Sequence, residues 1–172
     1  MIRTILHYPD KRLRNPGLPV TDFGAEFQAL VDDMAETMYE APGVGLAAPQ
    51  IGVSLALFVV DCAEAETPSD FRVFANPVIL QTRETVSWPE GCLSFPNAQE
   101  DIERAKWVKV KAQDRNGNWF ELETEGLLAI AVQHEFDHLQ GKLMIDRIGP
   151  LKKRLLHRKM EKRATAQARA GA

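Results

Sequence analysis

The chain has 172 residues, 45% hydrophobic and 26% charged with a net charge of −3, which is typical of one globular domain with a single core. Charges at Arg3 and Asp10 interrupt the opening segment and exclude a signal peptide, and no apolar run reaches membrane-spanning length. We therefore expect a cytoplasmic protein with no membrane partner, in which Cys62 and Cys92 are free thiols rather than a disulfide.

The predicted elements before residue 126 are one helix followed by four strands. Residues 25–39 carry apolar side chains at helical spacing, which predicts an N-terminal helix. Four later segments have the apolar or alternating pattern of strands: residues 55–62, 71–80, 107–114 and 119–125. The last two flank Asn116-Gly117, a strong hairpin signal, so we expect them to pair with each other.

The stretch APGVGLAAPQ, residues 41–50, is rich in small side chains. One interpretation is a helix end followed by a tight loop. The other is a wall along which an extended substrate backbone pairs, because glycines such as Gly45 permit close approach. Gln50 at its end could aim its amide NH2 at a developing oxyanion.

Residues 126–141 form a helical segment that is apolar most of the way round. This pattern predicts a buried central helix, and Gly141 suits its C-terminal end. A third, C-terminal helix is expected from Pro150 to residue 165. Together these elements predict an α+β fold in which antiparallel sheets surround the central helix.

His134, Glu135 and His138 give this central helix the H-E-x-x-H pattern of metal-dependent hydrolases. Two histidines four residues apart project from one face and can bind one ion, while Glu135 lies beside them and can accept a proton. Two core histidines satisfied by hydrogen bonds are the alternative. Because buried polar groups without partners are costly, we favour a metal site.

A catalytic site of this type usually has a third protein ligand, and the helix does not supply it. Met144 stands where some metallopeptidases have a histidine, but its thioether suits copper. Glu161 has the spacing of the glutamate in some zinc peptidases, but it lies among basic residues. Cys92, which follows Gly91, offers a thiolate to zinc or iron. Residue types favour Cys92 over Glu161 and leave a fourth position open for water.

Three stretches together resemble the peptide deformylase family: GVGLAAPQ at 43–50, EGCLS at 90–94 and QHEFDHLQG at 133–141. They stand in the family's order and at family-like spacing, within a resemblance that extends from about Leu6 to Leu151. It implies a hydrolase of protein biosynthesis that removes the formyl group from the N-formylmethionine of nascent polypeptides.

The resemblance also implies the roles of individual residues. It assigns the metal ligands to Cys92, His134 and His138. It assigns the acid/base to Glu135, with a metal-activated hydroxide attacking the formyl carbon, and the oxyanion donors to the Gln50 side chain and the Leu93 backbone N–H. It implies Fe²⁺ as the native ion, with zinc, nickel or cobalt as substitutes, whereas ligand types alone would favour zinc.

The substrate is expected to lie in an apolar pocket that takes its methionine side chain. The positions assigned to substrate binding are Val44, Gly45, Trp88, Glu90, Gly91, Leu127, Ile130 and Ala131. Glu90 is also expected to pair with Arg104 and so to hold the cysteine loop. Gln99 replaces an arginine of some bacterial members, so the resemblance assigns no peptide contact beyond methionine to this position.

The C-terminal residues 151–172 form a basic tail. They contain eight Lys or Arg and one acid, a net +7 that leaves −10 on residues 1–150. A solvated helix face is one interpretation. Since a C-terminal helix contacts the ribosome in related bacterial enzymes, we expect a salt-sensitive contact with RNA phosphates and no sequence-specific nucleic-acid binding. We divide the chain into a catalytic domain, 1–150, and this tail, and expect a monomer.

Two other functions are compatible with the motif. A general zinc peptidase would use Glu161 as its third ligand. A ribosome- or RNA-binding module would hold a structural metal and would not depend on the carboxylate of Glu135.

Overall fold

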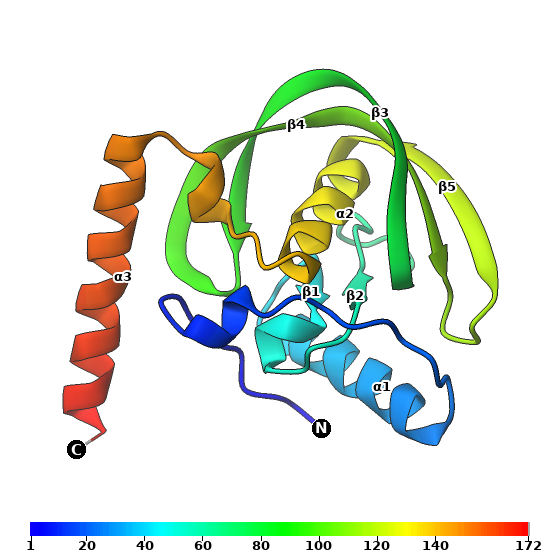
Figure 1. The fold of residues 1–172 in the computed structure, drawn as a ribbon, viewed down its shortest axis with the longest axis horizontal. Coiled ribbons are helices and arrows are strands. Elements are labelled where there is room, and N and C mark those ends of the chain that lie inside the picture. Colours follow the sequence, from blue (N-terminus) through cyan, green and yellow to red (C-terminus); the bar gives the residue numbers. More distant parts are fainter. Residues whose placement is uncertain (172) are drawn as a thin grey trace.

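Over residues 1–171, which the computed structural model describes, the chain forms one five-stranded antiparallel sheet and three α-helices (Figure 1). The strands, in sheet order, are β1 (Gly45–Ala47), β2 (Leu57–Val60), β3 (Arg72–Cys92), β4 (Phe95–Gln113) and β5 (Trp119–Glu125). The helices are α1 (Ala25–Glu40), α2 (Gly126–Leu139) and α3 (Pro150–Ala170). The predicted α+β class is confirmed, but a single curved sheet takes the place of several.

Strands β3 and β4 are far longer than the segments that predicted them. The sequence indicated strands at 71–80 and 107–114, but β3 continues to Cys92 and β4 already begins at Phe95. The added length arches over α2 (Figure 1). Most of its β3 side chains are exposed, so it lacks the apolar composition by which strands are recognised. The arch ends in a tight turn that pairs Cys92 with Phe95 and brings the cysteine back to α2.

The glycine-rich stretch forms the short strand β1 and a following 3-10 helix, Ala48–Ile51. Strand β1 pairs with β2, and it is the first strand in the sheet order. Its other edge therefore has no strand partner within residues 1–171. This extended, one-sided backbone is compatible with the second interpretation, a wall along which a substrate backbone pairs.

Helix α2 lies at the centre of the fold, and most of its residues from Ala129 onward are buried. Its C-terminal end is a Schellman motif, in which Lys142 N–H donates to the Asp137 carbonyl at 2.9 Å and Gly141 N–H to that of His138 at 3.1 Å. Gly141 has φ 69°, a conformation that glycine adopts without steric cost. The predicted helix end is confirmed, and it fixes the last turn of α2.

Helix α3 packs against the body through one face, although it stands at the side of the molecule (Figure 1). Leu156 and Met160, one turn apart, are buried in a cluster with Leu6, Phe95 and other apolar residues. Tyr8 Oη lies 2.7 Å from His157 Nδ1. The helix extends to Ala170, five residues beyond the predicted end. None of the helices described is long and apolar enough to cross a membrane.

Replacement of Leu156 by alanine is expected to lower the free energy of unfolding by about 2–5 kcal/mol, because it leaves a cavity between α3 and the body. Leu155 is 56% exposed on the same helix, so Leu155→Ala is the matched control and should change stability by only about 0.5 kcal/mol. Chemical denaturation measures both. Equal losses in the two variants would contradict the packing of α3 through Leu156.

Candidate active site

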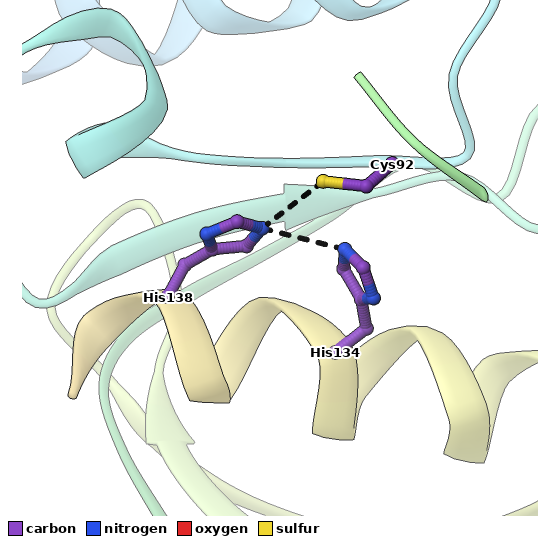
Figure 2. A group of neighbouring side chains, drawn as sticks. All are labelled: Cys92, His134 and His138. Carbon is purple, nitrogen blue, oxygen red and sulfur yellow. Dashed lines mark hydrogen bonds between the residues drawn. The ribbon is translucent and has the colours of Figure 1, made fainter. Parts of the chain in front are cut away.

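Three potential metal ligands from two distant segments meet at one point (Figure 2). Cys92 is the last residue of β3, and His134 and His138 lie on successive turns of α2. His138 Nε2 lies 3.3 Å from His134 Nε2 and 3.5 Å from Cys92 Sγ. All three ligand atoms lie within 4.8 Å of one another.

This spacing fits a tetrahedral metal ion. Metal–nitrogen bonds of about 2.05 Å and a metal–sulfur bond of about 2.3 Å place two nitrogens about 3.3 Å apart and nitrogen about 3.6 Å from sulfur. The two separations measured from His138 Nε2 match these values, and the third pair, between His134 and Cys92, lies within 4.8 Å. Three protein ligands leave one tetrahedral position for water or substrate, as in catalytic rather than structural sites.

A buried network of charged side chains holds the first histidine. Glu90 Oε1 accepts a hydrogen bond from His134 Nδ1 at 2.7 Å, which leaves His134 Nε2 to face the other two ligands. Arg104 donates to both oxygens of Glu90, at 2.7 and 2.9 Å, as expected from the sequence. It also donates to Asp137 at 2.6 Å, and Asp137 accepts from Arg147 at 2.5 and 2.6 Å.

The pKa values of the two histidines are shifted in opposite directions. Burial and the neighbouring His134 hold the pKa of His138 well below its usual value, so its imidazole is neutral and has a lone pair. Burial alone would also lower the pKa of His134, but Cys92 and Glu90 outweigh it and raise that pKa well above its usual value. A metal ion would compete with this proton, as metal binding at such sites generally does.

Glu135 lies beside the ligands, against the backbone of β1. A Cβ added at Gly45 would lie only 2.6 Å from Glu135 Oε1, so a glycine is needed there to admit the carboxylate. Glu135 is buried, and its Oε2 has no hydrogen-bond partner among the described residues. Burial raises the pKa of this carboxyl to about 7. The group can therefore exchange a proton near neutral pH.

The Gln50 side chain points its NH2 group at the same centre. Its oxygen accepts the Ala47 backbone N–H at 2.9 Å, and this fixes which end of the amide faces the ligands. The NH2 donates to Ser94 Oγ at 3.0 Å and lies 3.6 Å from Cys92 Sγ. Leu93, whose backbone N–H is the other predicted oxyanion donor, follows Cys92 in the turn between β3 and β4.

A cleft of about 610 Å³ opens beside the ligands. All eight positions assigned to substrate binding line it: Val44, Gly45, Trp88, Glu90, Gly91, Leu127, Ile130 and Ala131. Gln50, Leu93 and Glu135 line it as well, whereas His138 lies behind the surface. His7 and Arg163 also line the cleft and were not expected from the sequence, because the fold alone brings the two ends of the chain to this place.

The alternative third ligands lie elsewhere. Met144 is buried in the apolar cluster below α3. Glu161 is exposed on α3, and its carboxylate lies 3.1 Å from His157 Nε2. Neither belongs to the ligand group, so the arrangement that a zinc peptidase using Glu161 would require is not present in the described residues.

Comparisons with known proteins agree on one family. A family model described as polypeptide deformylase matches residues 2–154. A peptide deformylase of Acidobacterium capsulatum is 50% identical over 162 residues, 94% of this chain and 95% of that protein. The crystal structure of a peptide deformylase from Legionella pneumophila is 48% identical with a TM-score of 0.91, covering 98% of this chain and 99% of that one. The structure of peptide deformylase from Ehrlichia chaffeensis is 32% identical with a TM-score of 0.92, with the same coverage.

Replacement of Glu90 by glutamine is expected to weaken metal binding about 10- to 100-fold, because the His134 ring loses its carboxylate partner. Competition against a chelator of known affinity measures the change. Glu84→Gln is the matched control, since Glu84 lies on the same strand but forms only a surface pair with Lys106. Unchanged metal affinity in Glu90→Gln would mean that Glu90 serves only to neutralise Arg104.

Proposed function

The chain belongs to the polypeptide deformylase family and removes the N-formyl group of formylmethionyl polypeptides, and we propose that the reaction takes place at Cys92, His134 and His138. The observation that carries this assignment is the meeting of these three ligand atoms beside the buried carboxylate of Glu135. The cleft next to them would admit the substrate.

The proposed cofactor is one divalent metal ion held by these three side chains. We infer Fe²⁺ as the native ion from the family resemblance, and a thiolate with two imidazoles is equally suited to zinc, nickel or cobalt. When bound, such an ion acts as a Lewis acid and lowers the pKa of water at its open position.

Glu135 is proposed as the residue that moves the proton. Its unpartnered Oε2 can accept a proton from the attacking water, and its pKa near 7 lets it release that proton again to the leaving amine. The bond that breaks joins the formyl carbon to the methionine nitrogen, and the products are formate and a free N-terminus.

Gln50 and the Leu93 backbone N–H are proposed to donate hydrogen bonds to the oxyanion that forms on the formyl group. The contact between Ala47 and the Gln50 oxygen orients the NH2 before substrate arrives, so little reorganisation is needed during the reaction. One donor of this kind is typically worth about 3–4 kcal/mol in the transition state.

The substrate backbone is proposed to lie along the free edge of β1, near Gly45, as an added strand. Its methionine side chain would enter the apolar part of the cleft, where Leu127 and Val44 are partly exposed and Ile130 forms the buried wall. This arrangement presents the formyl group to the ligands and directs the rest of the polypeptide along the cleft.

Replacement of Glu135 by glutamine is expected to slow formate release from a formyl-Met peptide about 10²- to 10⁴-fold, because the amide cannot carry the proton, while metal content is retained. Glu161→Gln is the control, because it removes a carboxylate outside the site and should keep full activity. Formate release and metal content are measured on the same preparations. Undiminished turnover by Glu135→Gln would overturn the assignment of the acid/base.

We further propose that the basic tail, residues 151–172, docks on ribosomal RNA while residues 1–150 carry catalysis. Arg154, Arg158 and Lys162 are exposed and lie one turn apart, roughly opposite to the face of α3 that is packed on the body. Binding there would place the cleft near newly made chains, in the cytoplasm. One chain supplies every group of the proposed site, which is consistent with action as a monomer.

Changing Arg154, Arg158 and Lys162 together to glutamate is expected to abolish co-sedimentation with ribosomes, because three phosphate contacts become repulsive. The matched control keeps the positive charges by combining Arg154→Lys, Arg158→Lys and Lys162→Arg. It should still co-sediment with ribosomes, in a salt-dependent manner. Truncation is a poorer test, since it would expose the cluster beneath Leu156. Equal co-sedimentation of both triple variants would contradict docking through this face.

A further inference from the structure

A cationic side chain from the far end of the sequence reaches the substrate cleft. Arg163 of α3 lines the cleft together with His7 of the N-terminal segment and with Asn97 and Ala98 of the β4 end. Arg163 follows Leu156 and Met160 at helical spacing, on the face of α3 that packs against the body. Lys159 Nζ donates a hydrogen bond to the Asn97 carbonyl and holds this part of α3 against β4.

The charge of Arg163 is not used within the described part of the molecule. Its Nε is buried and has no hydrogen-bond partner there. The ion pairs of α3 are made instead by Lys152, Lys153 and His157. The buried Arg104 and the partly buried Arg147, by contrast, are held by carboxylates. A buried guanidinium N–H without an acceptor is costly, so this position favours an acceptor brought by a ligand.

His7 provides a second polar group at the same end of the cleft. The hydrogen bonds from Leu6 N–H to the Gln50 carbonyl, 2.7 Å, and from Tyr8 N–H to the Ser94 carbonyl, 2.9 Å, fix the backbone on both sides of His7. Burial and the nearby Arg163 charge lower the pKa of His7, so its ring is neutral near pH 7. The neutral ring of His7 can donate an N–H to a ligand, and it carries no charge that would repel the guanidinium of Arg163.

A guanidinium with an unused N–H, beside a neutral donor, is a suitable partner for a carboxylate. The formyl end of the substrate lies at the ligands, so the polypeptide beyond methionine must run along the rest of the cleft. We propose that Arg163, with His7, forms a subsite that binds a carboxylate of the substrate downstream of its formylmethionine. This inference rests on the proposed function, and it makes α3 part of substrate selection.

The test compares formyl-Met peptides that differ in one charge. Each peptide has a C-terminal amide and carries Glu or its isostere Gln at the second, third or fourth residue. Wild-type enzyme loaded with metal should have a kcat/KM roughly threefold or more higher for Glu than for Gln at one of these positions, at low salt. In Arg163→Gln this ratio should fall to about one. Arg169→Gln is the matched control, because it removes an exposed arginine of the same helix and should keep the ratio.

A second arm distinguishes the source of the carboxylate. The all-neutral peptides are also compared with a free C-terminus and with the amide. A preference for the free terminus that Arg163→Gln removes would support the subsite and assign it to chain ends rather than to side chains. Ratios of one for every pair in the wild type, or a preference that survives Arg163→Gln, would overturn the proposal. Failure of the wild type to release formate from any peptide would instead overturn the proposed function.

Discussion

The bidentate pair between Arg104 and Glu90 is the interaction on which the rest of the structure depends. Both side chains are buried, so each charge needs the other, and removal of one partner from such a pair typically costs about 3–5 kcal/mol. Through these two residues and Asp137, the network joins β3, β4 and α2, and Arg147 extends it to the segment before α3. Glu90 Oε1, which accepts a hydrogen bond from Arg104, also accepts one from His134 Nδ1 and so orients that ring. One network thus fixes both the arch of the sheet and the direction of a proposed metal ligand.

A second constraint comes from the backbone of β1. Gly45 has no side chain, so the carboxylate of Glu135 can lie directly against this strand. Gln50, just beyond β1, is held by the Ala47 N–H, and the free edge of the strand faces the cleft. Residues 43–50 therefore serve three purposes. They make room for the proposed acid/base, supply the Gln50 oxyanion donor and form the proposed track for the substrate. This explains why a segment with the composition of a loop is an ordered part of the site.

Local patterns in the sequence were sufficient to predict α1, α2 and the hairpin of β4 and β5, because each has a clear helical or alternating period. They were insufficient for the outer halves of β3 and β4, where exposed polar residues are held in strands by pairing with each other.

At the site, the spacing of His134 and His138 predicted their shared face, but nothing local connects them to Cys92, 42 residues away in sequence. Asp137 could have been noticed within the motif itself, since it lies between the two histidines. Arg163 could not have been identified from the sequence, because it lies in a run of basic residues. Only the packing of α3 shows that it lines the cleft.

The proposed chemistry requires that Cys92, His134 and His138 together hold one catalytic divalent ion. X-ray absorption spectroscopy of the iron- or zinc-loaded protein tests it most directly, because sulfur and nitrogen neighbours scatter differently. If Cys92 binds the ion, the spectrum should show one sulfur at about 2.3 Å with nitrogen or oxygen neighbours at about 2.0–2.1 Å, and Cys92→Ser should lose the sulfur contribution. A spectrum of the unmodified protein that contains only nitrogen and oxygen neighbours would contradict it.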